Sequence, residues 1–129
     1  MKWNPKRDKN KRLATFYQTL YLLNITLLPV IAFVIFLLSY QKNKTNDNPL
    51  VVQHFRQSFL ANIVAGILLI LVSSLILFFG SLDSVYTWMW LIMYFLCIHS
   101  ILILYGVFAL IKANSGEEYT YPLFGKLWK

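Results

Sequence analysis

Three long apolar stretches, none of which contains Asp, Glu, Lys or Arg, divide the sequence. They cover residues 20–40, 58–80 and 87–111, and are 21, 23 and 25 residues long. An α-helix rises about 1.5 Å per residue and the hydrocarbon core of a bilayer is about 30 Å thick, so about 20 residues span it. In lipid the backbone must satisfy its own hydrogen bonds, which favours helix. The pattern therefore predicts an all-α integral membrane protein with three transmembrane helices.

The polar positions between these stretches set the boundaries of the predicted elements. Apolar residues recur at helical spacing from Leu13, so the first helix begins before its apolar stretch and is kinked near Pro29. Asn48-Pro49 is typical of a loop. We therefore predict a single membrane domain over 1–129, made of a basic tail (1–12), helix one (13–40), a loop (41–54), helix two (55–80), a turn (81–86), helix three (87–112) and an interfacial aromatic tail (113–129).

Small side chains predict how helices two and three pack. The short turn makes these helices an antiparallel hairpin, in which residues at equal depth have a constant sum of residue numbers. Three pairs of small residues, 65 with 106, 61 with 109 and 58 with 113, meet this condition to within one residue. Small residues allow close backbone approach in lipid. The helix-packing candidates are therefore Ser58, Ala61, Ala65, Gly106, Ala109 and Ala113.

Composition and charge agree with a membrane location. Hydrophobic residues make up 58% of the chain and charged residues 13%, whereas soluble domains average about 25% charged residues. The net charge of +7 lies beside the apolar stretches, so the bilayer, with its anionic lipids, is the expected partner and nucleic acid is not. If helix one spans the membrane, six Lys and Arg residues fall on each side. The positive-inside rule then selects no orientation.

Polar and aromatic side chains gather at one end of the predicted hairpin. The start of helix two and the end of helix three lie on the same side of the membrane, so their polar residues are neighbours. Tyrosines in the following tail favour the headgroup level. The interaction-surface candidates at this end are His54, Arg56, Gln57, Lys112, Asn114, Glu117, Glu118, Tyr119 and Tyr121.

The sequence contains no recognisable catalytic set. Glu117 and Glu118 are adjacent, so they do not form the facing pair that acid–base chemistry needs. We find no nucleophile–base set, phosphate loop or metal-ligand spacing, and we predict no catalytic residue, no cofactor and no metal site. His99 lies in the middle of helix three, where an ionisable residue is a functional hypothesis. A neutral His99 hydrogen-bonded to Ser100 or to another helix is the favoured interpretation.

Four segments of the chain resemble a known protein family. They are Leu28-Pro29-Val30, Gln41-Lys42-Asn43-Lys44, His54-Phe55-Arg56-Gln57 and, most specifically, Ile111-Lys112-Ala113-Asn114-Ser115-Gly116-Glu117-Glu118-Tyr119-Thr120-Tyr121-Pro122-Leu123. Over about residues 20–124 the chain is similar to small bacterial membrane proteins of unknown function, related to the channel-like subunit of the chloroplast inner-envelope protein translocon. This resemblance implies a multi-pass protein of the bacterial inner membrane. It also implies a cytoplasmic first loop and C-terminal tail.

These observations favour a non-catalytic role. We predict an accessory, assembly or scaffolding subunit that contacts the bilayer and either other membrane protein subunits or further copies of itself. The alternative is a component of a protein-translocating or channel-like assembly, which the resemblance implies. A less favoured alternative is a haem- or quinone-associated redox subunit that uses His99.

Overall fold

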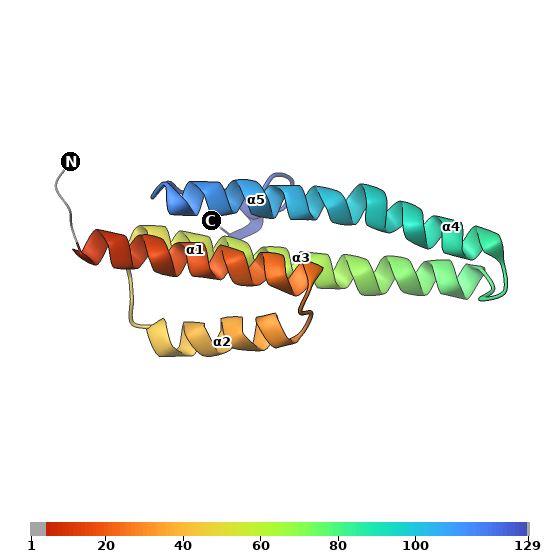
Figure 1. Cartoon of the computed structure of the whole chain (residues 1–129), viewed down its shortest axis with the longest axis horizontal. Helices are drawn as coiled ribbons and strands as arrows, with labels where there is room; N and C mark the ends of the chain where they lie inside the picture. Colours follow the sequence, from red (N-terminus) through yellow and green to blue (C-terminus); the bar gives the residue numbers. More distant parts are fainter. Residues whose placement is uncertain (1–4, 129) are drawn as a thin grey trace.

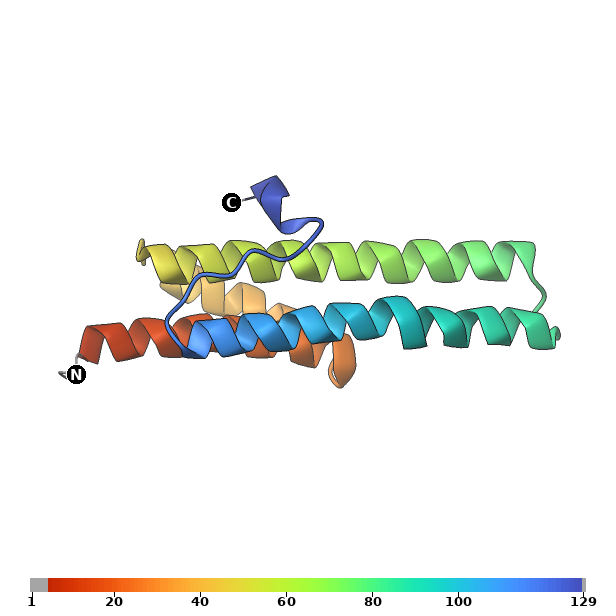
Figure 2. The same ribbon diagram turned by 90° about the horizontal axis from the view of Figure 1, so that it is seen from above.

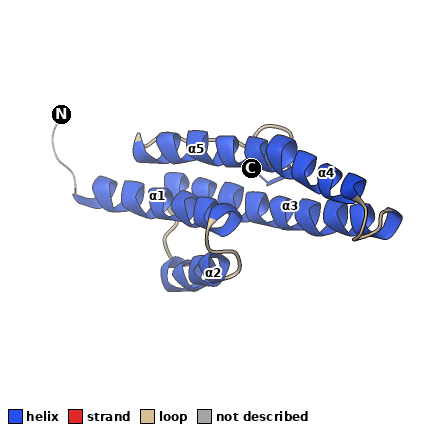
Figure 3. Cartoon of the chain, turned by 45° about the vertical axis from the view of Figure 1, so that its right-hand side comes forward, coloured by secondary structure: helices blue, strands red, loops and turns tan. Residues whose placement is uncertain are grey.

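The computed structural model describes residues 5–128, and this part of the chain consists of helices joined by short loops (Figure 1). The elements in chain order are α1 (Pro5–Thr26), α2 (Ile31–Asn43), α3 (Pro49–Phe79), α4 (Val85–Tyr94), η1 (Phe95–His99), α5 (Ser100–Asn114) and η2 (Gly125–Trp128). No strand occurs within the described range, and Figure 3 shows only helix and loop there. The predicted all-α class is therefore confirmed for these residues.

The prediction of one helix over 13–40 is wrong. α1 ends at Thr26, and α2 begins at Ile31 and runs back alongside α1 (Figures 1 and 2). Pro29 has no N–H to continue the helix, and Val30 adopts a left-handed conformation with φ of 71°. The Val30 N–H donates instead to Asn24 Oδ1 over 3.0 Å. The expected kink is therefore a complete reversal of the chain.

Three other predicted boundaries also move. The predicted basic tail is helical from Pro5 onward, and the predicted loop is shorter because α3 begins at Pro49 rather than at residue 55. Asn48 is the N-cap of α3, and its side chain accepts hydrogen bonds from the N–H groups of the first turn. Asparagine at the N-cap followed by proline at the first helical position is a favourable helix start. The turn after α3 ends earlier than predicted, because α4 begins at Val85.

Two helices of the described chain are long and apolar enough to cross a membrane, Pro49–Phe79 and Val85–Asn114. The second contains one π-helical turn, η1, between α4 and α5. These two helices run side by side in opposite directions over the length of the molecule, whereas α1 and α2 cover only one half of it (Figure 2). The apolar windows of the two helices are only 17% and 22% buried. Lipid is the environment that suits so much exposed apolar surface.

The core lies in the half of the molecule where α1, α2, α3 and α5 meet. One buried cluster joins α1, α2 and α3, and in it the rings of Phe36 and Phe55 stack with centroids 5.3 Å apart. A second cluster joins α1, α3, α5 and the C-terminal segment through Tyr21, Ala61, Ala109 and Tyr121. This arrangement makes α1 a shared neighbour of α3 and α5.

All six helix-packing candidates are buried. A Cβ added at Gly106 would lie 2.7 Å from the Tyr21 ring and 2.6 Å from Leu22, both on α1. The small face of α5 therefore receives α1 at this depth. The sequence paired residues 65 and 106 across the hairpin, whereas the atoms nearest to a Cβ at Gly106 belong to α1.

The predicted interfacial tail (113–129) is partly a core element. Gly116 ends α5 in a left-handed conformation with φ of 76°, and the Glu117 N–H donates to Lys112 O over 2.9 Å, as in a Schellman motif. The chain then crosses α3, and Tyr121 is only 1% exposed. Hydrogen bonds from side chains of α3 hold it there, so the tail does not simply lie on the membrane surface.

Candidate functional site

The reversal after α1 brings the charged segments to one end of the molecule. The start of α1, the loop between α2 and α3, and the turn after α5 all lie there, and the 80–84 turn lies at the other end (Figures 1 and 2). Asn46 Nδ2 donates to Asn10 Oδ1 over 3.2 Å and joins two of these segments. Ten described Lys and Arg residues belong to this basic end: Lys6, Arg7, Lys9, Lys11, Arg12, Lys42, Lys44, Arg56, Lys112 and Lys126. Among the described charged residues, only Asp83 is in the opposite turn.

A chain of buried polar side chains lies below the basic end. Gln18 of α1 and His54 of α3 are fully buried, and Gln18 Nε2 lies 2.9 Å from His54 Nδ1. His54 Nε2 lies 2.8 Å from the carbonyl oxygen of Glu117. Because that carbonyl can only accept, Nε2 carries the proton and Nδ1 accepts from Gln18. The Tyr121 hydroxyl donates to Gln18 Oε1 over 2.6 Å and completes the chain.

Two glutamines one helical turn apart fasten the C-terminal segment to α3. Gln53 bonds both backbone groups of Tyr119: its Nε2 donates to the carbonyl oxygen and its Oε1 accepts from the N–H over 3.1 Å. Gln57 Oε1 accepts from the Tyr121 N–H over 2.9 Å. Gln57 Nε2 donates to the carbonyl oxygens of Gly125 and Trp128 over 2.9 and 3.0 Å. We call residues 117–128, held in this way, the C-terminal strap.

The members of this network satisfy one another. Both nitrogens of His54 and both amide atoms of Gln18 have hydrogen-bond partners. Burial raises the pKa of the Tyr121 hydroxyl well above its ordinary value, and this hydroxyl therefore stays a donor. Buried polar networks whose members are all satisfied specify a unique packing. The network fixes the strap against α1 and α3.

Replacing Tyr121 with Phe should lower the free energy of unfolding by about 1–2 kcal/mol, because Gln18 Oε1 is left buried without its donor. Denaturant unfolding in detergent micelles measures the change. The matched control is Tyr86→Phe, because the Tyr86 side chain is 72% exposed. Equal stability of the two variants would contradict a contribution of this bond.

The other surface candidates lie around this network. Lys112 and Glu117 form an ion pair with Nζ 2.5 Å from Oε2, but both side chains are about half exposed, and such pairs contribute little. The Arg56 guanidinium lies over the Trp128 ring, 5.7 Å from its centroid. Glu118 and Asn114 are exposed. The surface candidates therefore lie together at one end of the molecule, but the sequence did not distinguish the buried residues of the network from the exposed residues around it.

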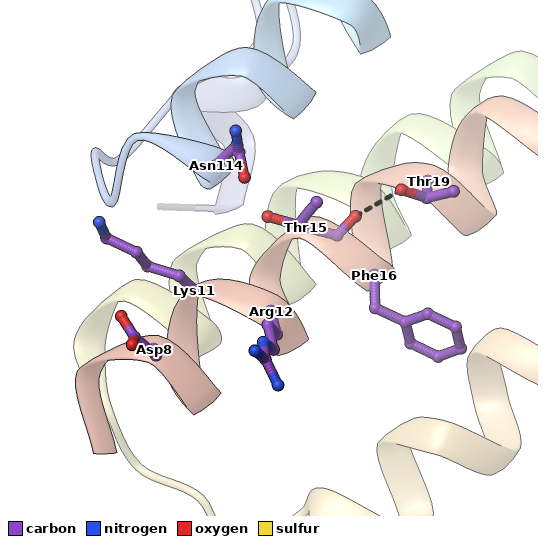
Figure 4. Close-up of a pocket in the computed structure, with 7 residues that line it drawn as sticks. All are labelled: Asp8, Lys11, Arg12, Thr15, Phe16, Thr19 and Asn114. Carbon is purple, nitrogen blue, oxygen red and sulfur yellow. Dashed lines mark hydrogen bonds between the residues drawn. The ribbon is translucent and has the colours of Figure 1, made fainter. Parts of the chain in front are cut away.

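A cavity of about 420 Å³ opens between α1 and the end of α5 at the basic end (Figure 4). Lys11, Arg12 and Asn114 line it together with Thr15, whose backbone carbonyl accepts the Thr19 hydroxyl over 2.8 Å. Asp8 also lies on the wall and offsets part of the positive charge. Basic pockets between membrane helices suit anionic headgroups.

His99 lies far from these groups, in the π-helical turn η1. Its Nε2 is 2.7 Å from the carbonyl oxygen of Ile25 in α1. That carbonyl faces Pro29, which has no N–H for the usual helical bond. The expected hydrogen bond from His99 to another helix is confirmed. Because Nε2 donates here, a haem iron would have to displace this bond to use it.

The residues that sequence reasoning missed are Gln18 and Gln53. A signal for Gln53 was available, because Gln53, His54 and Gln57 recur on one face of α3. Gln18 belongs to α1, so this pattern did not include it. Within residues 5–128 no group of three or more His, Cys, Asp or Glu side chains could hold a metal ion.

Comparison with known proteins identifies one family. Residues 9–128 match the MamF/MmsF family, described as the magnetosome magnetite crystal formation protein family. The match covers nearly the whole chain and includes most of α1, the strap and both long apolar helices. This is a small bacterial family, in agreement with that part of the sequence resemblance. No curated protein and no solved structure matches the chain.

Proposed function

The chain belongs to the MamF/MmsF magnetosome magnetite crystal formation family, and on this premise we propose that it is a non-catalytic accessory or scaffolding subunit of the crystal-forming membrane. The observation that carries the proposal is the family match over residues 9–128. The two long apolar helices support a place within the bilayer. The basic end supports a contact surface at the membrane boundary.

We propose a membrane topology with two full spans. α3 and the 85–114 helix cross as an antiparallel hairpin, and α1 and α2 enter from the basic end and turn back inside the bilayer. Helical chain is acceptable at that depth because its backbone groups are bonded internally. The ten described Lys and Arg residues then share one side, and the positive-inside rule assigns that side to the cytoplasm.

The accessory role is supported by the outer surface of the spanning helices. Large apolar side chains on α3, α4 and η1 point away from the core, and Ile70, Phe78, Phe79, Val85 and Leu96 are each 66–82% exposed. Such surfaces pack against lipid and against other membrane helices. We propose that other subunits of the crystal-forming membrane, or further copies of the chain, occupy part of this surface.

A complementation experiment tests the role. A magnetite-forming bacterium that lacks its own MamF/MmsF protein receives this chain with its native N- and C-termini, and crystal size is measured by electron microscopy. We expect larger, more uniform crystals than in the empty-vector strain. A chain that reaches the membrane in normal amount without changing the crystals would refute the proposal.

The alternative is a channel-like component, which the resemblance to translocon-related proteins implies. Reconstitution into planar bilayers separates the two proposals. A subunit of the accessory type should give no conductance above that of protein-free bilayers. Reproducible single-channel steps that disappear in the Gln57→Leu variant would favour the channel instead.

A further inference from the structure

A second cavity, of about 350 Å³, lies in the apolar half of the molecule beside the turn between α1 and α2. Its walls come from the end of α1, the turn, the middle of α3 and the π-helical turn η1. The residues that matter for its chemistry are Asn24, Val30, Gly66, Ile70, Phe95 and His99. Asn24 Nδ2 donates to Asn62 Oδ1 over 2.9 Å and joins α1 to α3 beside the cavity.

His99 lines this cavity, and one of its ring nitrogens has no hydrogen-bond partner. The side chain is 8% exposed, and its Nδ1 has no partner, while Nε2 donates to the carbonyl oxygen of Ile25. In a neutral imidazole that donates through Nε2, Nδ1 carries a lone pair and no proton. A buried acceptor without a donor is unfavourable. A bound molecule with a donor group would remove this cost.

Three features of the backbone lie at the wall of this cavity: Gly66, Val30 and η1. A Cβ built at Gly66 meets nothing within 4 Å, so the missing side chain adds free space on the α3 wall. Val30 holds a positive φ, which is a strained conformation for a β-branched residue. η1 is a π-helical turn, and such turns are frequent at functional sites. Strain of this kind also concentrates at binding sites.

The rim of the cavity determines how a ligand enters. Val30 and Ile70 are each 70% exposed, and Phe95 is 46% exposed. In the proposed topology these residues face the acyl chains, so the opening leads into the bilayer rather than into water. The ligand is therefore lipid-soluble.

We propose that this cavity binds a lipid-soluble molecule whose hydroxyl group donates a hydrogen bond to His99 Nδ1. The cavity volume lies within the usual range for small-molecule sites. The cavity accommodates a compact head group of the ligand, while the apolar tail of the ligand remains in the bilayer. A carbonyl group cannot replace the hydroxyl, because His99 Nδ1 offers no proton. Phenolic hydroxyls of quinols and aliphatic hydroxyls of diacylglycerols share this chemistry.

Binding is tested with the full-length protein in lipid nanodiscs, with ¹⁵N-labelled histidine. The probes are decylubiquinol, its oxidised form decylubiquinone, and dioleoylglycerol. We expect at least one hydroxyl probe to move the His99 Nδ1 resonance in a saturable way, and decylubiquinone to leave it unchanged. A response to the quinol alone identifies a phenolic hydroxyl as the donor, and a response to the diacylglycerol alone identifies an aliphatic hydroxyl. If neither hydroxyl probe moves the resonance, or if the quinone moves it equally, the proposal is wrong.

Two variants locate the bound molecule, with affinity followed by quenching of intrinsic tryptophan fluorescence. In His99→Gln the amide nitrogen can keep the donation to Ile25 while the ring acceptor is lost, so we expect at least a tenfold weaker affinity. Gly66→Leu fills the cavity and should abolish binding, whereas Gly66→Ala, its matched control, should retain it. Wild-type affinity in both His99→Gln and Gly66→Leu would overturn the assignment to this cavity.

Discussion

Cysteines introduced at Pro5 and Thr45 should react with a membrane-impermeant maleimide from the same side of the membrane, and a cysteine at Asp83 only from the opposite side. The reason is the reversal at Pro29, which returns the chain to the end where α1 began. Labelling in right-side-out and inverted vesicles measures the accessible side. We expect each cysteine to be labelled from one side only, because the maleimide does not cross the membrane along the spanning helices.

The background for this experiment is Cys97→Ser, because Cys97 is exposed on a spanning helix. The three sites are chosen so that no lysine or arginine is removed, which keeps the positive-inside signal intact. If residue 5 is labelled together with residue 83 and not with residue 45, helix one crosses the membrane. That result would refute the two-span topology.

Replacing Gln57 with Leu should release the C-terminal strap and lower the free energy of unfolding by roughly 3–5 kcal/mol. The side chain is fully buried and serves the Tyr121 N–H and two carbonyl oxygens. Leucine leaves these groups unsatisfied, and each costs about 1–3 kcal/mol. Trypsin cleavage after Lys126, followed by mass spectrometry, should then be at least tenfold faster than in the wild type.

The control for this prediction is Gln41→Leu, which makes the same chemical change at an exposed position. Its unfolding midpoint and its cleavage rate should both match the wild type. Wild-type cleavage at Lys126 in the Gln57→Leu variant would mean that other contacts hold the strap, with Tyr121 and Trp128 as the next residues to replace.

The sequence predicted the helical class well because the apolar stretches leave the backbone no alternative in lipid. It did not predict the reversal at residues 27–30. Pro29 alone is compatible with a kinked membrane helix. The Val30 N–H is bonded locally, by Asn24 six residues earlier, but the carbonyl of Ile25 is bonded by His99, 74 residues further along the chain. Such partners are visible only when the helices are placed together.

The sequence predicted at which end of the molecule the candidate residues lie, but not which of them are buried. His54 and Gln57 were correctly placed near the C-terminal tail, because a short turn fixes the two long helices as neighbours. His54 is covered by Gln18, which belongs to α1, whereas Gln57 is bonded by the C-terminal strap. A pattern read along one helix does not reveal which neighbour covers each face.

Because α1 and α2 extend along only one half of the molecule, its two ends differ in width (Figures 1 and 2). α1, α2, α3, α5 and the strap fill the cross-section near the basic end, whereas α3 and α4 fill it near the 80–84 turn (Figures 1 and 2). A protein that narrows toward one end occupies more area in one leaflet of the bilayer than in the other. In the proposed orientation the wider end lies in the cytoplasmic leaflet, so the chain fits best where the bilayer bulges toward the cytoplasm, as the wall of a vesicle does.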